Sequence, residues 1–163
     1  MTEINRLLQK LCEADVDFVI VGGFAAMLHG SSMLTRDLDV CAVLTDASIA
    51  KLRETFRDLH PVHRQTPQRL SFLDTPDAGV PLKNAYLQTD LGPLDVMSSI
   101  TGIGEFESVR KHAVPFDLFG RRVYVISIEE LIKAKEALGR HKDLLVAQEL
   151  RAIVEKNGKP SNQ

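Results

Sequence analysis

The sequence lacks most of the features that mark specialised classes of protein. Its 163 residues include two cysteines, no tryptophan and only 6% aromatic residues. No CxxC pair or disulfide framework is visible, so we expect Cys12 and Cys41 to be core or near-core thiols. His60, His63 and His112 lie in dissimilar contexts without the spacing of metal ligands, which argues against a zinc site.

The chain also lacks an excess of charge and a long apolar run. Its net charge of −2 argues against broad nonspecific binding to nucleic acid, although local basic patches are compatible with it. The longest apolar run, residues 18–28, is interrupted by glycines and too short to span a bilayer, and neither end carries a secretory or address signal. With 44% hydrophobic and 26% charged residues, we expect one soluble globular domain, cytoplasmic and without a membrane partner.

Apolar periodicity and turn residues divide the chain into short elements. The patterns predict helices over residues 4–15, 24–29, 45–59, 106–111 and 127–155, the last with a joint near Gly139. They predict strands over residues 18–21, 37–44, 69–73, 85–90 and 94–97, and a hairpin formed by residues 114–118 and 121–126. Residues 60–68, 74–81 and 98–104 are expected to be loops. Thr45 or Asp46 is expected to cap one helix, and Ser127 with Glu130 has the spacing of a capping box.

Two aspartates on one expected strand give the first chemical signal. Side chains alternate along a strand, so Asp37 and Asp39 face the same way, with Leu38 and Val40 on the opposite face. Two carboxylates on one face repel each other unless a cation lies between them. Mg²⁺ is usually bound by one or two carboxylates together with substrate phosphates, so the pair indicates a magnesium site. The alternative is a solvated strand face, although aspartate is disfavoured in strands.

A glycine pair and a third aspartate fit the same site. Gly22 and Gly23 follow an apolar strand, where the backbone can approach a ligand closely and the next helix offers N–H groups to an anion; a plain turn is the alternative. Asp95 lies on a later strand that could lie beside the strand carrying Asp37 and Asp39. The alternative is that Asp95 is only on the polar side of an edge strand. Three carboxylates from adjacent strands can hold two Mg²⁺ ions, and the third can accept a proton from an attacking hydroxyl.

These residues together resemble the signature of the DNA polymerase beta-like nucleotidyltransferase superfamily. Within it, the sequence is most similar to the small bacterial proteins of the AbiEii and minimal nucleotidyltransferase type. The similarity covers roughly residues 16–145 and is carried by Val19-Ile20-Val21-Gly22-Gly23, His29-Gly30, Thr35-Arg36-Asp37-Leu38-Asp39, Asp95, Lys133-x-Lys135 and Arg140-x-Lys142-Asp143.

The resemblance implies an α/β (α+β) fold, with a mixed β-sheet flanked by helices. A catalytic domain would span residues 1–126, a helical extension packed on it residues 127–156, and a flexible tail residues 157–163. The protein would use Mg²⁺, or Mn²⁺, to move a nucleoside monophosphate from a triphosphate to a hydroxyl of RNA, protein or a small molecule. The catalytic and metal-binding residues would be Asp37, Asp39 and Asp95, and the nucleotide-binding residues Gly22, Gly23, Ser31, Lys133, Arg140 and Lys142.

Three functions are compatible with the sequence. The protein could be an active transferase, or one half of a toxin–antitoxin or phage-defence system with a cognate partner, as similar families often are. It could also be a nucleotide- or partner-binding module that has lost transfer. Gly23 favours this last alternative, because many members of the superfamily have a serine there whose hydroxyl helps hold the triphosphate. The basic residues of the last helices also fit a solvated helix face.

Overall fold

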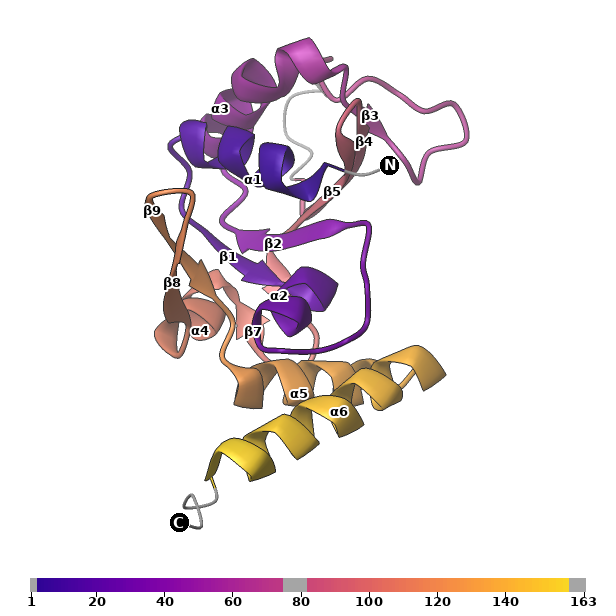
Figure 1. The fold of residues 1–163 in the computed structure, drawn as a ribbon. Helices are drawn as coiled ribbons and strands as arrows, with labels where there is room; N and C mark the ends of the chain where they lie inside the picture. The colour runs from indigo at the N-terminus through magenta and orange to yellow at the C-terminus, as the bar shows by residue number, and fades with distance from the viewer. Residues whose placement is uncertain (1–2, 75–81, 159–163) are drawn as a thin grey trace.

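A seven-stranded mixed sheet forms the centre of the computed structural model, which describes residues 3–74 and 82–158 (Figure 1). Its strands are β1 (Phe18–Val21), β2 (Leu38–Ala42), β3 (Val62–His63), β4 (Asn84–Thr89), β5 (Gly92–Met97), β8 (Val114–Leu118) and β9 (Arg121–Val125). They are ordered β3-β4-β5-β2-β1-β9-β8 across the sheet. A separate two-stranded sheet consists of β6 (Ser99–Ile100) and β7 (Gly104–Glu105). The expected α/β fold with a mixed sheet is therefore confirmed.

The pairing of β2 with β5 determines what lies at the centre of the sheet. These two strands are parallel, and Asp39 lies opposite Asp95. The antiparallel neighbours place Val21 of β1 opposite Asp39 and Tyr86 of β4 opposite Asp95. Residues opposite each other on adjacent strands share a face, so these four form one row across the sheet. The residues flanking the two aspartates on β2 and β5 are buried and apolar, and they belong to the core on the other face.

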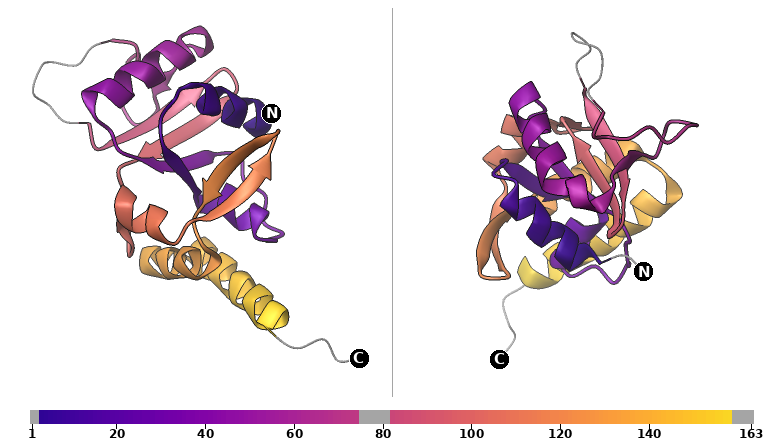
Figure 2. Two further views of the ribbon diagram at one scale, coloured as in Figure 1. Left: turned by 90° about the vertical axis from the view of Figure 1, so that its left-hand side faces the viewer. Right: turned by 90° about the horizontal axis from the view of Figure 1, so that it is seen from above.

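Helices pack around this sheet. They are α1 (Ile4–Glu13), α2 (Gly22–Leu28), α3 (Asp46–Phe56, continued by a 3-10 turn over Arg57–Leu59), α4 (Phe106–Lys111), α5 (Ile128–Leu138) and α6 (His141–Gly158). α1 packs on α3, α5 packs on α6, and α2 lies against β1, β2 and α5. Figures 1 and 2 place the α1–α3 pair and the α5–α6 pair at opposite ends of the molecule. In the described parts of the chain, no helix combines the length and apolar character needed to cross a bilayer.

Side-chain caps begin two helices where the sequence predicts them. Thr45 Oγ1 accepts a hydrogen bond from the Ser48 N–H at 3.1 Å, and Ser48 Oγ accepts one from the Thr45 N–H at 2.9 Å, so the two residues form a reciprocal capping box at α3. Ser127 Oγ accepts a hydrogen bond from the Glu130 N–H at 3.2 Å and caps α5. Each contact satisfies a backbone donor that the first helical turn leaves unpaired.

The region before β4 differs from the sequence-based expectation. Residues 69–73 do not form the expected strand and contribute only an isolated bridge between Ser71 and Val62. The reason is tertiary: Phe72 is buried in the core, and its carbonyl accepts a hydrogen bond from Arg53 Nε of α3 at 2.8 Å. The neighbouring residues 62–63, expected to be loop, form β3 instead.

Other boundaries also shift. Residues 98–104 were expected to be loop but contain β6 and the start of β7. Helix α6 runs to Gly158, past the expected end of the helical extension at residue 156. Residues 75–81 of the expected turn and residues 159–163 of the expected tail lie outside the described residues. Cys41 is buried and Cys12 half-buried, and both are free thiols, as expected.

Candidate active site

Three carboxylates meet on one face of the central sheet. Asp39 and Asp95 are direct neighbours on β2 and β5, and Asp37 lies immediately before β2, two residues ahead of Asp39. One carboxylate oxygen from each of the three lies within 4.8 Å of the other two. The structure thus brings together the three aspartates that the sequence singles out.

Burial and repulsion make the middle carboxylate unusually basic. Burial is the largest cause, followed by the negative charges of Asp95 and Asp37, and together they raise the pKa of Asp39 to about 7. Lys135 acts in the opposite direction but does not compensate. Near neutral pH, Asp39 therefore tends to hold a proton unless a cation takes the proton's place.

The arrangement fits a divalent cation. Oδ1 of Asp39 is buried and accepts no hydrogen bond from the described residues, whereas buried polar atoms normally have a partner. Gly22 leaves room for the Asp39 carboxylate, because a Cβ at position 22 would overlap Oδ2 of Asp39. Carboxylate oxygens are the ligands that Mg²⁺ and Mn²⁺ prefer, so Asp37, Asp39 and Asp95 are the residues that could hold such an ion.

Arg64, a basic residue that the sequence analysis did not assign to the site, forms an ion pair with Asp95. Arg64, directly after β3, donates a hydrogen bond from Nη2 to Oδ2 of Asp95 at 2.9 Å. Its Nη1 lies 2.6 Å from Oδ1 of Asp95, an ion-pair distance without the alignment of a hydrogen bond, and donates to the Leu87 carbonyl at 3.0 Å. The hydrogen bond to Asp95 is the main cause that raises the pKa of Arg64 above its usual value.

Helices α5 and α6 present positive charge to the same space. The carboxylate of Asp143, 1% exposed, pairs with Arg140 Nε at 2.6 Å and Lys135 Nζ at 3.4 Å. Burial acts to raise the pKa of Asp143, but the two cations outweigh it and hold that pKa below its ordinary value. The hydrogen bond to Asp143 is the main cause that raises the pKa of Arg140, and the charge of Asp39 adds a smaller contribution. Asp143 therefore fixes two cations that act electrostatically on the acidic cluster.

These groups line one cleft of about 610 Å³ between the sheet and the α5–α6 pair. Of the residues expected from sequence, it contains Gly22, Gly23, Asp37, Asp39, Asp95, Arg140 and Lys142. It also contains residues that the sequence analysis did not assign to the site, among them Thr35, Arg64, Gln65, Asn84, Tyr86, Lys135 and Asp143. One side is apolar, with Met33, Leu34 and Leu138 partly or largely exposed.

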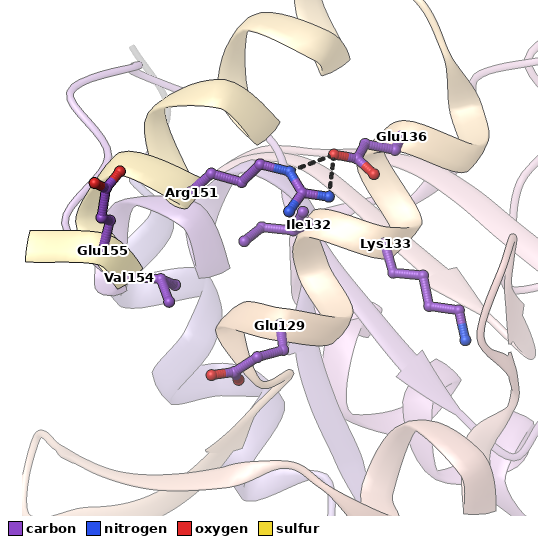
Figure 3. A pocket seen from close by; sticks show the side chains of 7 residues that line it. All are labelled: Glu129, Ile132, Lys133, Glu136, Arg151, Val154 and Glu155. Carbon is purple, nitrogen blue, oxygen red and sulfur yellow. Dashed lines mark hydrogen bonds and ion pairs between the residues drawn. The ribbon is translucent and has the colours of Figure 1, made fainter. Parts of the chain in front are cut away.

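Two residues expected to bind nucleotide are not brought to this cleft. Lys133 lines a separate groove of about 350 Å³ between α5 and α6, which the Arg151–Glu136 ion pair crosses (Figure 3). Ser31 is absent from the cleft lining, and its Oγ accepts a hydrogen bond from the Met33 N–H at 3.2 Å. Lys133 lies on α5 and Ser31 in the loop after α2, but neither residue lines the cleft.

Lys135 takes the place that was expected for Lys133. It lies four residues after the buried Leu131, and residues four apart share a helix face. Because Leu131 is apolar in the sequence, this four-residue spacing favoured Lys135 over Lys133 as the lysine that faces the cleft.

Thr35 explains why a glycine occupies position 23. A Cβ at Gly23 would lie 2.9 Å from the Thr35 Cβ and 3.0 Å from its Oγ1, so the threonine fills the space of a side chain there. Thr35 Oγ1 also accepts a hydrogen bond from the Asp37 N–H at 3.2 Å, which orients the start of β2. The cleft therefore has a hydroxyl next to the glycine pair, supplied by a different residue.

The raised pKa of Asp39 predicts a pH-dependent stability in metal-free protein. Because its pKa rises from 3.8 in the unfolded chain to about 7 in the folded state, the folded state binds more protons between these values and loses stability as the pH rises through them. Asp39→Asn should remove this loss. Urea unfolding in EDTA should show the variant gaining on the wild type with pH, by at most about 4 kcal/mol above pH 7. A difference that does not change with pH would contradict the assignment.

Comparison with known proteins identifies the fold. No model of a known protein family matches the chain, and no curated protein matches its sequence. Among solved structures, the lincomycin-bound lincosamide antibiotic adenylyltransferase LnuA superposes with a TM-score of 0.58 and 17% identity over 94% of this chain and 98% of that one. The candidate nucleotidyltransferase TM1012 from Thermotoga maritima gives 0.52 and 17% over 96% of both chains.

A third solved structure agrees with these two. The antigenic nucleotidyltransferase-like protein from Paracoccidioides brasiliensis gives a TM-score of 0.53 and 16% identity over 94% of this chain and 74% of that one. At this level of identity the similarity concerns the fold. The chain therefore has the fold of these solved structures, whereas the superfamily and the AbiEii-type subfamily stay predictions.

Proposed function

We propose that the protein is a Mg²⁺-dependent nucleotidyltransferase, with Mn²⁺ as a substitute metal. It would transfer a nucleoside monophosphate from a nucleoside triphosphate to an acceptor hydroxyl. The observation that carries the proposal is the convergence of Asp37, Asp39 and Asp95, whose carboxylate oxygens lie within 4.8 Å of one another, with the buried Oδ1 of Asp39 accepting no hydrogen bond from the described residues. The fold shared with solved nucleotidyltransferases supports it.

In this proposal each side of the cleft has its own role. Asp37, Asp39 and Asp95 hold the divalent cation, which would supply charge neutralisation at the phosphates. Gly22 and Gly23 leave the backbone accessible to the terminal phosphates. Lys135, Arg140 and Lys142 contact phosphate oxygens from the opposite side, so that a nucleotide spans the two charged walls. Carboxylates on one side of the cleft and basic residues on the other are the arrangement expected for a bound polyanion with its metal.

The reaction exchanges one phosphorus–oxygen bond for another and moves one proton. The oxygen of the acceptor hydroxyl forms a bond to the α-phosphorus, the bond from that phosphorus to the oxygen bridging to the β-phosphate breaks, and pyrophosphate leaves. The hydroxyl proton passes to a carboxylate, and we assign this role to Asp95. Its position opposite Asp39 on the neighbouring strand supports this assignment.

The direct test uses all four triphosphates, each labelled at the α-phosphate. They are incubated with the protein and Mg²⁺ or Mn²⁺, in the presence of cellular RNA, cellular protein or a panel of small hydroxyl-bearing molecules. We expect covalent label on one acceptor class and none in EDTA. No label in any mixture, together with no thermal stabilisation by any nucleotide and metal, would refute the proposal.

Two lysines on one helix test the basic wall. Lys135→Ala should weaken nucleotide binding by about tenfold, because it removes a cation that faces the cleft. Lys133→Ala is the matched control, since it removes the same charge from the same helix but from a different groove, and it should bind as the wild type does. Isothermal titration with a non-hydrolysable triphosphate and Mg²⁺ measures both. Equal losses, or a larger loss for Lys133, would reverse the assignment.

For the acceptor we propose a small hydroxyl-bearing molecule with an apolar part. Met33, Leu34 and Leu138 provide an exposed apolar border to the cleft, and the chain carries no basic excess that would favour RNA. RNA or protein labelling in the screen would replace this assignment.

We also propose an AbiEii-type role, with a cognate partner in a toxin–antitoxin or phage-defence system in the cytoplasm. Leu138, Leu144 and Leu145 near the α5–α6 turn are large exposed apolar residues, as a partner surface requires. Growth arrest on expression, abolished by Asp37→Ala, is the expected result. Normal growth on expression without a partner would contradict the toxin role.

A further inference from the structure

Contacts of both its side chain and its backbone hold Arg64 beside Asp95. The guanidinium group lies against both oxygens of Asp95 and also donates to the Leu87 carbonyl. The Arg64 N–H donates to the Tyr86 carbonyl at 2.8 Å, which fixes the backbone beside β4. The Arg64 side chain is 24% exposed and that of Asp95 12%, so little water screens the pair.

Among the described residues, no cation forms an ion pair with the other two carboxylates of the cluster, Asp37 and Asp39. Lys135, the cation that acts on Asp39, has its ammonium group on Asp143. Positive charge in direct contact with the cluster is therefore confined to Asp95. Because an arginine side chain does not deprotonate in proteins, this charge is permanent.

We propose that Arg64 is a resident counter-ion that competes with a divalent cation for Asp95 and thereby sets the cation affinity of the site. The inference rests on the proposed function, since it takes the three aspartates as the cation site. Asp37 and Asp39 bind the cation first, and Asp95 contributes fully only when Arg64 yields. Two causes oppose the cation at Asp95: the guanidinium already engages both oxygens, and its charge repels a second positive ion.

Direct titration of Mn²⁺ without nucleotide tests this competition. Arg64→Gln removes the charge but keeps a polar side chain, and it should bind Mn²⁺ about tenfold more tightly than the wild type. Arg64→Lys keeps the charge but loses the two-point contact, and its gain should be smaller. Paramagnetic resonance of free Mn²⁺ measures both affinities without requiring activity.

Arg53→Gln is the matched control. Arg53 also has a buried contact through its guanidinium, to the Phe72 carbonyl and ring, but does not line the cleft. This variant should bind Mn²⁺ as the wild type does. In EDTA, Arg64→Gln should also unfold at a lower temperature than the wild type. Addition of Mn²⁺ should then raise the unfolding temperature of Arg64→Gln by more than it raises that of the wild type.

Each result decides between alternatives. If the wild type binds Mn²⁺ and Arg64→Gln binds it no more tightly, the counter-ion inference is wrong and the proposed function stands. If the wild type binds no Mn²⁺ with or without nucleotide, the proposed function itself fails, and this inference with it. Should Arg64→Gln not fold even with Mn²⁺, then Arg64→Lys decides, and an affinity no higher than that of the wild type overturns the inference.

Discussion

Asp39→Asn is expected to lower nucleotidyl transfer by about a thousandfold or more while the protein stays folded. The side chain keeps its size but loses the charge at the centre of the three-carboxylate cluster, where both its neighbours act on it. An amide oxygen is a weaker ligand for Mg²⁺, so cation binding should weaken together with transfer. The labelled-nucleotide assay, run at saturating metal, measures the loss once the acceptor class is known.

Asp117→Asn on β8 provides the control for this change. Its side chain is 80% exposed and, among the described residues, forms an ion pair only with the exposed Arg122, so the same chemical substitution should leave transfer unchanged. A transfer rate for Asp39→Asn within a few times that of the wild type would exclude the role assigned to the cluster. Because relief of repulsion should stabilise this variant at neutral pH without metal, loss of activity cannot be ascribed to unfolding if that gain is observed.

Gly22→Ala is expected to cause the second large effect, a loss of both stability and cation binding. A Cβ at this position overlaps the Asp39 carboxylate, so either the strand end or the carboxylate must move. The left-handed backbone at φ +66° adds a penalty of about 1 kcal/mol for any residue with a Cβ. The free energy of unfolding and the Mn²⁺ affinity are the two measurements.

Gly120→Ala separates these two causes. Gly120 lies in the β8–β9 hairpin with a φ of +71°, close to that of Gly22, but a Cβ there meets nothing within 4 Å. This control should lose about 1 kcal/mol from backbone strain alone and bind Mn²⁺ normally. If Gly22→Ala and Gly120→Ala lose the same stability and both bind the cation, close approach of the Gly22 backbone to Asp39 has no functional role.

The parts of the site that the sequence predicted are those that depend on local pattern. Asp37 and Asp39 share a face because strands alternate, and the apolar neighbours of Asp95 indicate a central strand. Thr45 and Ser127 act as caps because their side chains reach backbone groups three residues away. In each case the cause and its effect lie within a few residues of each other.

The parts that were missed depend on contacts between distant segments. Arg64 meets Asp95 only because β3 pairs with β4, and β3 is too short for its two residues to show a period. Residues 69–73 look like a strand by composition, but burial of Phe72 and its bond to Arg53 determine their path. The choice between Lys133 and Lys135 required the orientation of α5 relative to the sheet, for which Leu131 was the available marker.

The parallel register of β2 and β5 affects how the chain folds. A slip of β5 by one residue would turn Asp95 into the apolar core and expose Leu94 or Val96 in its place, so the cluster exists in one alignment only. The two strands are separated in the chain by α3, β3 and β4, and such nonlocal pairing is slow to form. Manganese uptake during refolding should therefore lag behind helix formation and report when the central strands have reached their native alignment.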